Sequence, residues 1–434
     1  MRLGAIAVLG AIAVLGAIAR AEAEPPCAVA RRELASFATT TADGFALRSL
    51  SPYVGGEVAT ALVRRAAAVG PQLAFELFVA AGLSGEAEAL RALRSAAPPP
   101  HPQARLGRSL ALLALGDGDE TSTIAVTLES GPIAQRLDIV TALARMHQPR
   151  PRELLYRALD DAEPEIRLVA AEALVRLRSA KGKRVLLELA RSGAESLKIR
   201  AARALGSSRY AGASLDVLPE SIGARASVRL AAQGRADVLR RARVQVAGPS
   251  AEQRAAGFAA LVLSGQDSAA ALEKLSQRAV DRFGPAVSAE LAMAVALLGE
   301  ADATERLGAV APGDARAALD VLWAYAAADV ATLEPLVAAP ILAALEKWMV
   351  TGALADADQS RALEAASIIA GRSARGLARA RLLGPDGSAL RTAARVLGEI
   401  GVTEDVPALL EVARRVSGPS RVEAFRGAQR RCAE

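Results

Sequence analysis

The feature that most constrains the fold of this chain is an internal repeat of about 31 residues. A basic residue, an alanine and a leucine stand at fixed offsets, and the set occurs four times between positions 105 and 205. The basic members form a ladder of Arg105, Arg136, Arg167 and Lys198. Self-similarity at such a period is typical of solenoids, in which each unit covers the apolar face of its neighbour.

Each period is predicted to contain two helices. In one unit, residues 152–159 carry apolar side chains at helical spacing, and a turn at 161–164 ends in proline. Proline suits the first turn of a helix because its missing N–H would be unpaired there in any case. The second helix, 164–177, has a broad apolar stripe that includes Ile166, Leu174 and Leu177. Hydrophobic residues make up 52% of the chain but aromatic residues only 3%, so we predict an all-α core of alanine and leucine.

Two segments resemble a known family. DDAEPEIRLVAAEAL at 160–174 and DGSALRTAARVLGEIG at 386–401 are similar to HEAT repeats, specifically the short bacterial type related to phycobilisome-lyase repeats. The resemblance implies a right-handed α-solenoid of stacked helical hairpins with a period of about 30–31 residues. The signatures of ankyrin and tetratricopeptide repeats, which have similar periods, are missing.

The expected organisation has three parts, of which the last varies in regularity. They are a signal peptide at 1–23, an irregular helical N-terminal cap at 24–98, and a repeat array at 99–434 that is regular over 104–206, divergent over 207–356 and regular again over 357–434.

The N-terminus predicts export. Arg2 precedes an uncharged apolar run at 3–19, and small residues then flank two cleavage positions, after Ala21 and after Ala23. This is the layout of a secretory signal peptide, so we expect a periplasmic or secreted protein. The alternative is an N-terminal membrane anchor, because the run reaches the lower limit for a membrane span.

Cys27 and Cys432, the two cysteines of the chain, stand near its two ends. An even count in an exported chain favours a disulfide. However, the ends of an extended array lie on the order of 100 Å apart at about 8–10 Å per helix layer, whereas a disulfide needs Cα atoms within about 7 Å. The alternatives are a superhelix that closes into a ring, a bond between two molecules, and free thiols.

The basic ladder has two interpretations. It could grip an acidic partner, in keeping with the net charge of +6. It could instead hold repeats together, with each arginine binding a turn acid such as Asp161 or Asp386, or nearby carbonyl groups. The second is favoured, because the planar guanidinium suits such pairing.

No catalytic, cofactor-binding or metal-binding residues are predicted. His101 and His147 lie beside prolines in expected loops, and no metal-ligand spacing or nucleophile motif accompanies them. The sparse aromatic residues gather at Trp323, Tyr325 and Trp348, either as a core plug or as a contact site on the concave face.

These features predict a non-enzymatic, exported scaffold that binds an unknown protein partner, which could be acidic, through its curved surface. We expect no cofactor, no nucleic acid and, after signal removal, no membrane partner; the oligomeric state is left open. The first alternative is a HEAT-like lyase or cofactor-handling protein that carries a chromophore. The second is a nucleic-acid-binding HEAT protein of the kind found among alkylpurine glycosylases.

Overall fold

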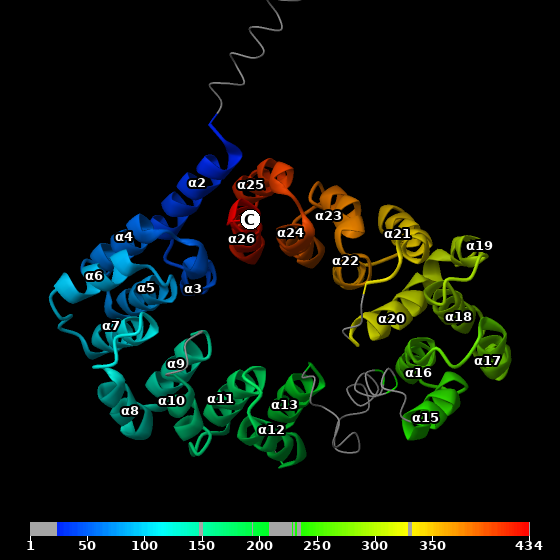
Figure 1. Cartoon of the computed structure of the whole chain (residues 1–434), viewed down its shortest axis with the longest axis horizontal. Helices are drawn as coiled ribbons and strands as arrows, with labels where there is room; N and C mark the ends of the chain where they lie inside the picture. The colour runs from blue at the N-terminus through cyan, green and yellow to red at the C-terminus, as the bar shows by residue number, and fades with distance from the viewer. Residues whose placement is uncertain are drawn as a thin grey trace, which may run out of the picture.

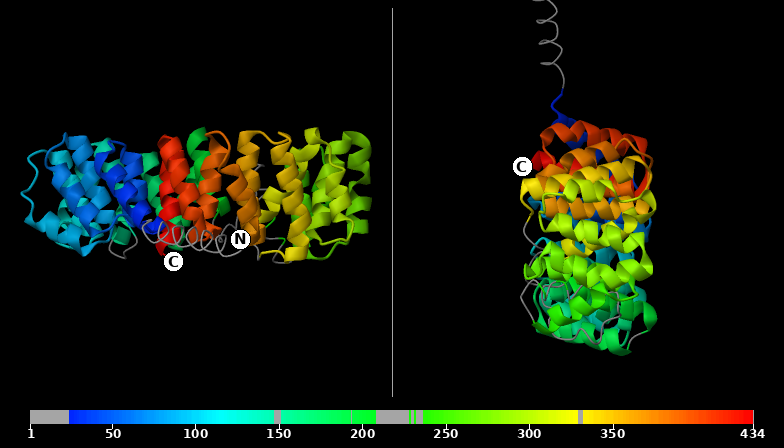
Figure 2. Two further views of the ribbon diagram at one scale, coloured as in Figure 1. Left: turned by 90° about the horizontal axis from the view of Figure 1, so that it is seen from above. Right: turned by 90° about the vertical axis from the view of Figure 1, so that its right-hand side faces the viewer.

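A computed structural model describes residues 24–146, 151–192, 194–207, 228, 231, 236–328 and 332–433. Within these ranges the regular structure is helical and no β-strand occurs. The helices follow one another around a ring (Figure 1), and their axes run roughly along its short dimension (Figure 2). The prediction of an all-α solenoid is confirmed.

The ring has two layers of helices, and each hairpin contributes one helix to each layer (Figure 1). The outer layer comprises α2 (Pro26–Thr40), α4 (Gly56–Ala66), α6 (Ala87–Ser95), α8 (Thr121–Ser130), α10 (Pro151–Ala158), α12 (Ala180–Ser192), α15 (Ala236–Val246), α17 (Ala269–Phe283), α19 (Ala303–Gly308), α21 (Pro335–Val350), α23 (Arg375–Arg381) and α25 (Val406–Arg415). The inner layer comprises α3 (Gly44–Leu50), α5 (Pro71–Leu83), α7 (Pro102–Ala114), α9 (Ile133–Leu143), α11 (Pro164–Arg176), α13 (Glu195–Ser207), α16 (Ala251–Ser264), α18 (Pro285–Leu297), α20 (Ala315–Ala326), α22 (Asp356–Ala370), α24 (Ser388–Ile400) and α26 (Gly418–Ala433).

The hairpins advance by nearly constant steps along the chain. The outer helices from α4 to α12 begin 29 to 34 residues apart, as the repeat in the sequence predicts. The helices α15 to α21 lie in the range expected to be divergent, and they continue the same alternation of outer and inner helices.

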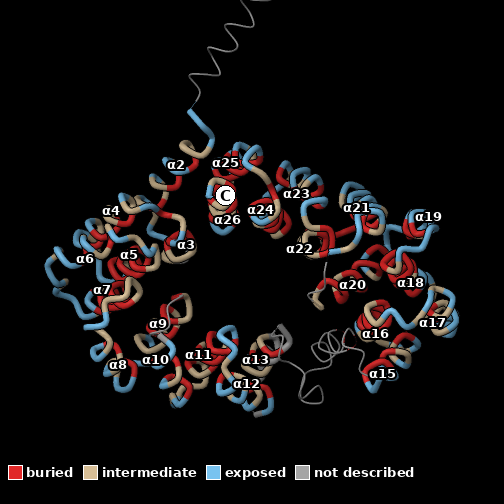
Figure 3. The backbone as a smooth tube through the Cα atoms, viewed as in Figure 1, coloured by how far each residue is buried: buried red, intermediate tan, exposed pale blue. Residues whose placement is uncertain are grey.

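The core lies between the two layers and between neighbouring hairpins (Figure 3). In α11, Ile166 and Leu174 are fully buried, as their places on the apolar stripe predict. Leu177, which was expected on the same face, is 39% exposed. The helix ends at Arg176, and Leu177 is its C-cap, where the chain turns away from the core.

Small residues allow the closest helix contacts. A Cβ atom built on Gly427 of α26 would lie 2.7 Å from the carbonyl oxygen of Ala394 in α24, and one built on Gly398 would lie 2.5 Å from the Cα atom of Gly427. Glycine is therefore required where α24 and α26 cross. This contact places α26, the last helix of the ring.

The N-terminal helices do not form the expected cap. The segment 24–98 is helical, but it packs on a neighbour at each side: α5 lies against α7, and α2 and α3 lie against α26. One hydrophobic cluster joins buried residues of α2–α7 with buried residues of α15–α26. A cap would leave one face to solvent, whereas these helices link the first repeats to the last.

Candidate functional site

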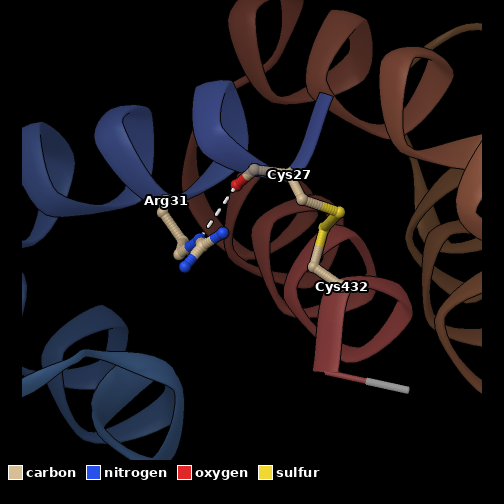
Figure 4. Close-up of a disulfide and its surroundings, with 3 residues drawn as sticks. All are labelled: Cys27, Arg31 and Cys432. Carbon is tan, nitrogen blue, oxygen red and sulfur yellow. Dashed lines mark hydrogen bonds between the residues drawn. A yellow bond between two sulfur atoms is a disulfide. The ribbon is translucent and has the colours of Figure 1, made fainter. Parts of the chain in front are cut away.

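A disulfide joins the two ends of the ring. Cys27 in the first turn of α2 and Cys432 in the last turn of α26 are bonded, with 5.4 Å between their Cα atoms (Figure 4). The Arg31 Nε atom donates to the Cys27 carbonyl oxygen at 3.3 Å. Of the alternatives that the sequence left open, the structure has the bond within one molecule. The large end-to-end distance of an extended array does not apply, because the array curves back on itself.

Polar contacts cross the same junction. The Arg414 guanidinium of α25 pairs with the Glu33 carboxylate of α2 at 2.6 Å, and this hydrogen bond raises the pKa of Arg414. The Arg430 Nε atom of α26 donates to the Tyr53 hydroxyl at 2.9 Å. These partners stand 381 and 377 residues apart in the sequence, so the ends meet over a surface rather than at one bond.

An aromatic pair lies within this surface. The rings of Phe37 in α2 and Phe425 in α26 stack with their centroids 5.3 Å apart. The Arg421 guanidinium lies 4.7 Å from the Phe37 centroid. Such stacking contributes about 0.5–1.5 kcal/mol beyond the burial of apolar area. The junction between the two ends thus combines apolar, aromatic and charged side chains, as a contact between neighbouring repeats does.

The basic ladder occupies one position in four successive repeats. Its members are the fourth residues of α7, α9, α11 and α13. Arg136 binds both carboxylate oxygens of Asp161 in the next turn, at 2.9 and 3.0 Å, and the Gly131 carbonyl oxygen at 2.7 Å. Arg167 donates to the Asp161 carbonyl oxygen at 2.8 Å. These two arginines therefore brace the turns before the inner helices, as the structural interpretation holds.

The two end members of the ladder lie on α7 and α13. Arg105 is exposed on α7, and Lys198 is half-buried in α13. The turn acid Asp386 is exposed as well. It is Asp356 of the preceding repeat that accepts hydrogen bonds from the Ser388 and Ala389 amides at the start of α24, at 2.7 and 3.2 Å.

Arg254 extends the pattern into the divergent region. It is the fourth residue of α16 and donates to the Pro249 carbonyl oxygen in the preceding turn at 2.8 Å. Its Nε and Nη2 atoms bind Glu290 of α18 at 2.8 and 3.0 Å. Arg254 is 4% exposed and Glu290 is fully buried. Burial raises the pKa of Glu290, against the opposing effect of the Arg254 hydrogen bonds.

Another arginine–acid pair links later repeats. Arg375 of α23 binds both carboxylate oxygens of Asp405, at 2.8 and 3.0 Å, and the Val402 amide donates to the same carboxylate at 3.0 Å. Burial acts to raise the pKa of Asp405, but these hydrogen bonds and the nearby positive charges hold it below its usual range. Such arginine–acid pairs recur between repeats. Much of the arginine content of the chain therefore serves to hold the repeats together.

The aromatic residues of the middle region divide between core and surface. Trp348 is 1% exposed and Tyr325 is buried, and burial raises the pKa of Tyr325. Trp323 on the inner helix α20 is half-buried. It borders a cleft of about 450 Å³ between α16, α20 and α22, and the Arg361 guanidinium lies 5.5 Å from its ring centroid. The core interpretation holds for two of the three residues.

The remaining predicted positions carry little chemistry. His101 is exposed, and its ring accepts a hydrogen bond from the Gln103 amide as the N-cap of α7. His147, Ala21 and Ala23 lie outside the described residues. Within the described part of the chain, no cluster of three or more His, Cys, Asp or Glu side chains is arranged to hold a metal ion. In the same part, no helix has both the length and the apolar character needed to span a bilayer.

Comparison with known proteins agrees with the repeat geometry. Residues 122–206, which span the helices α8–α13, match the family model described as HEAT repeats. This part of the chain is similar to HEAT repeats. The matched part contains Arg136 and Arg167, the two arginines that brace turns. An engineered protein of known crystal structure is similar at 18% identity, with a TM-score of 0.25, over 93% of this chain and 98% of that chain. No curated protein matches the chain.

Proposed function

We propose that this chain is an exported, non-enzymatic HEAT-type scaffold that binds a protein partner on the inner side of its ring. The cleft beside Trp323 carries the proposal. Tryptophan and arginine are the residues most enriched at the energetic centres of protein interfaces. Arg316 and Arg361 line this cleft together with Trp323, and Arg316 is exposed. Arg361 already pairs with Asp320 and Asp358. A partner segment with an apolar side chain for Trp323 and an acidic side chain for Arg316 would suit this cleft.

The disulfide supports export. Disulfides persist in oxidising compartments and are rare in the reducing cytosol of ordinary cells, and the apolar run near Arg2 has the layout of a signal peptide. We expect the mature chain to begin at Glu22 or Glu24 and to lie in the periplasm or outside the cell. Intact-mass analysis of the exported protein checks this: retention of Met1 would favour an N-terminal anchor instead.

Partner binding is tested by one substitution and a matched control. Trp323→Ala removes the aromatic surface of the cleft, whereas Leu336→Ala removes a side chain that is 90% exposed on the outer helix α21. Crosslinking and mass spectrometry with the native host should recover a partner from the wild-type protein and from Leu336→Ala, but not from Trp323→Ala. Equal recovery from all three would contradict the proposed site. A chromophore that co-purifies with visible absorbance would contradict the non-enzymatic role.

A further inference from the structure

Three arginines from distant parts of the sequence line a second cleft. Arg48 of α3, Arg145 just after α9 and Arg426 of α26 surround a space of about 370 Å³. Ser49 and Ser51 are among the other lining residues, and no carboxylate among the described residues lines this cleft. The helices α3, α9 and α26 all belong to the inner layer (Figure 1).

Carboxylates behind the cleft neutralise only part of this charge. Glu76 pairs with Arg48, and the Glu423 carboxylate accepts a hydrogen bond from Arg426 at 2.7 Å. Within the described part of the chain, Arg145 forms no ion pair. The Nε atoms of Arg48 and Arg426 are buried and have no hydrogen-bond partner among the described residues.

The electrostatics of Arg145 reflect this crowding. Burial lowers its pKa most, the positive charges of Arg48 and Arg426 lower it further, and Glu76 acts in the opposite direction. Burial raises the pKa of Asp138 on α9, whereas a hydrogen bond donated by the Gln103 side-chain amide at 3.1 Å and the charge of Arg48 act to lower it. The three arginines therefore line one cleft, and the neighbouring carboxylates neutralise only part of their positive charge.

We propose that this cleft binds a multivalent oxyanion, such as a phosphate or sulfate group. Guanidinium groups bind such anions through paired, charge-assisted hydrogen bonds. A doubly charged anion would neutralise the guanidinium of Arg145 and accept hydrogen bonds from more than one arginine. The Ser49 hydroxyl at the same cleft is a further donor.

The site depends on closure of the ring. Arg48 lies on α3, near the start of the chain, and Arg426 lies on α26, at its end. The two arginines line one cleft because α26 packs against α3. A bound oxyanion would therefore bridge the two ends of the solenoid and stabilise the closed ring. This inference does not rest on the proposed partner site at Trp323.

Isothermal titration calorimetry of the disulfide-linked protein at low ionic strength tests the site. Inorganic phosphate, inorganic pyrophosphate and a phosphoserine peptide serve as probes, to separate a free anion from a phosphate group on a larger molecule. We expect at least one probe to bind, and Arg145→Gln to weaken it about tenfold or more, as loss of a charged hydrogen bond implies. Arg372→Gln, at an exposed arginine between α22 and α23, should leave the affinity unchanged. No binding of any probe, or equal loss in both variants, would overturn the proposal.

Two further readouts separate a binding role from a structural one. Without anion, Arg145→Gln should unfold at the same or a higher temperature than the wild type, because it relieves repulsion among the arginines. A lower unfolding temperature would instead identify Arg145 as a structural residue. The double variant Cys27→Ser/Cys432→Ser should bind the anion more weakly, since closure is then less stable. Unchanged affinity in that folded variant would contradict the dependence on closure.

Discussion

The disulfide is expected to provide a large part of the stability of the closed ring. It links residues separated by 405 positions. The chain-entropy model gives a ceiling of about 6 kcal/mol for a loop of this length, and loss of a native disulfide typically costs about 2–5 kcal/mol. The exposed Arg414–Glu33 pair contributes about 0–1 kcal/mol, so it does not replace the bond.

The perturbation is Cys27→Ser/Cys432→Ser, which removes both thiols and so avoids linked dimers. Urea unfolding of this variant should show a loss of about 2–5 kcal/mol relative to the wild type under non-reducing conditions. Because repeat arrays unravel from free ends, amide hydrogen exchange should accelerate most in α2, α3 and α26. A change below about 0.5 kcal/mol, the scale of surface substitutions, with unchanged exchange in these helices, would refute the reasoning.

The other predictions concern the packing between repeats. Leu174→Ala should cost about 2–5 kcal/mol in urea unfolding, because the side chain is fully buried. Arg254→Met should cost about 3–5 kcal/mol by leaving the Glu290 carboxylate buried and unpaired, whereas Arg254→Met/Glu290→Leu should regain most of this loss. Gly427→Ala should lower the unfolding temperature, because its Cβ atom would meet the α24 backbone. The lowered pKa of Asp405 means that its contribution is complete above about pH 4 and is lost as pH falls through the lower, folded-state pKa, so Asp405→Asn should flatten the acid side of the stability profile.

Matched controls make each of these predictions decisive. Leu336→Ala should change the free energy of unfolding by less than about 0.5 kcal/mol. If Leu174→Ala caused a change as small as this, the helix face assigned to Leu174 would be wrong. A Cβ atom on Gly376 of α23 meets nothing within 4 Å, so Gly376→Ala should stabilise by about 0.5–1 kcal/mol. Stabilisation by Gly427→Ala as well would contradict the close crossing of α24 and α26. For the buried pair, a double variant as unstable as Arg254→Met would contradict the argument. An unchanged acid profile in Asp405→Asn would contradict the role given to its ionised form.

Local features of the repeat were predictable from the sequence. The turn at 161–164, the burial of Leu174 and the bracing role of Arg136 follow from patterns within one or two periods, where residue spacing determines which side chains meet. Closure of the ring does not follow in this way. The curvature of a solenoid accumulates from small rotations at every repeat, and no single repeat encodes where the chain will end.

The candidate oxyanion cleft depends on this long-range geometry. Arg48, Arg145 and Arg426 have unrelated positions in the sequence and meet only after the chain has closed. The pairing of Arg414 with Glu33 is hidden for the same reason. The sequence signal for closure is the placement of Cys27 and Cys432 near opposite ends of the chain, and it is also compatible with a linked dimer or free thiols.

Mass spectrometry of the purified protein without reduction tests the closed ring most directly. We expect a monomer whose mass is lower than the reduced mass by two hydrogen atoms, and whose digest contains the peptide of Cys27 covalently linked to the peptide of Cys432. Two alkylatable thiols in the folded monomer, or a dimer held together by these cysteines, would contradict it.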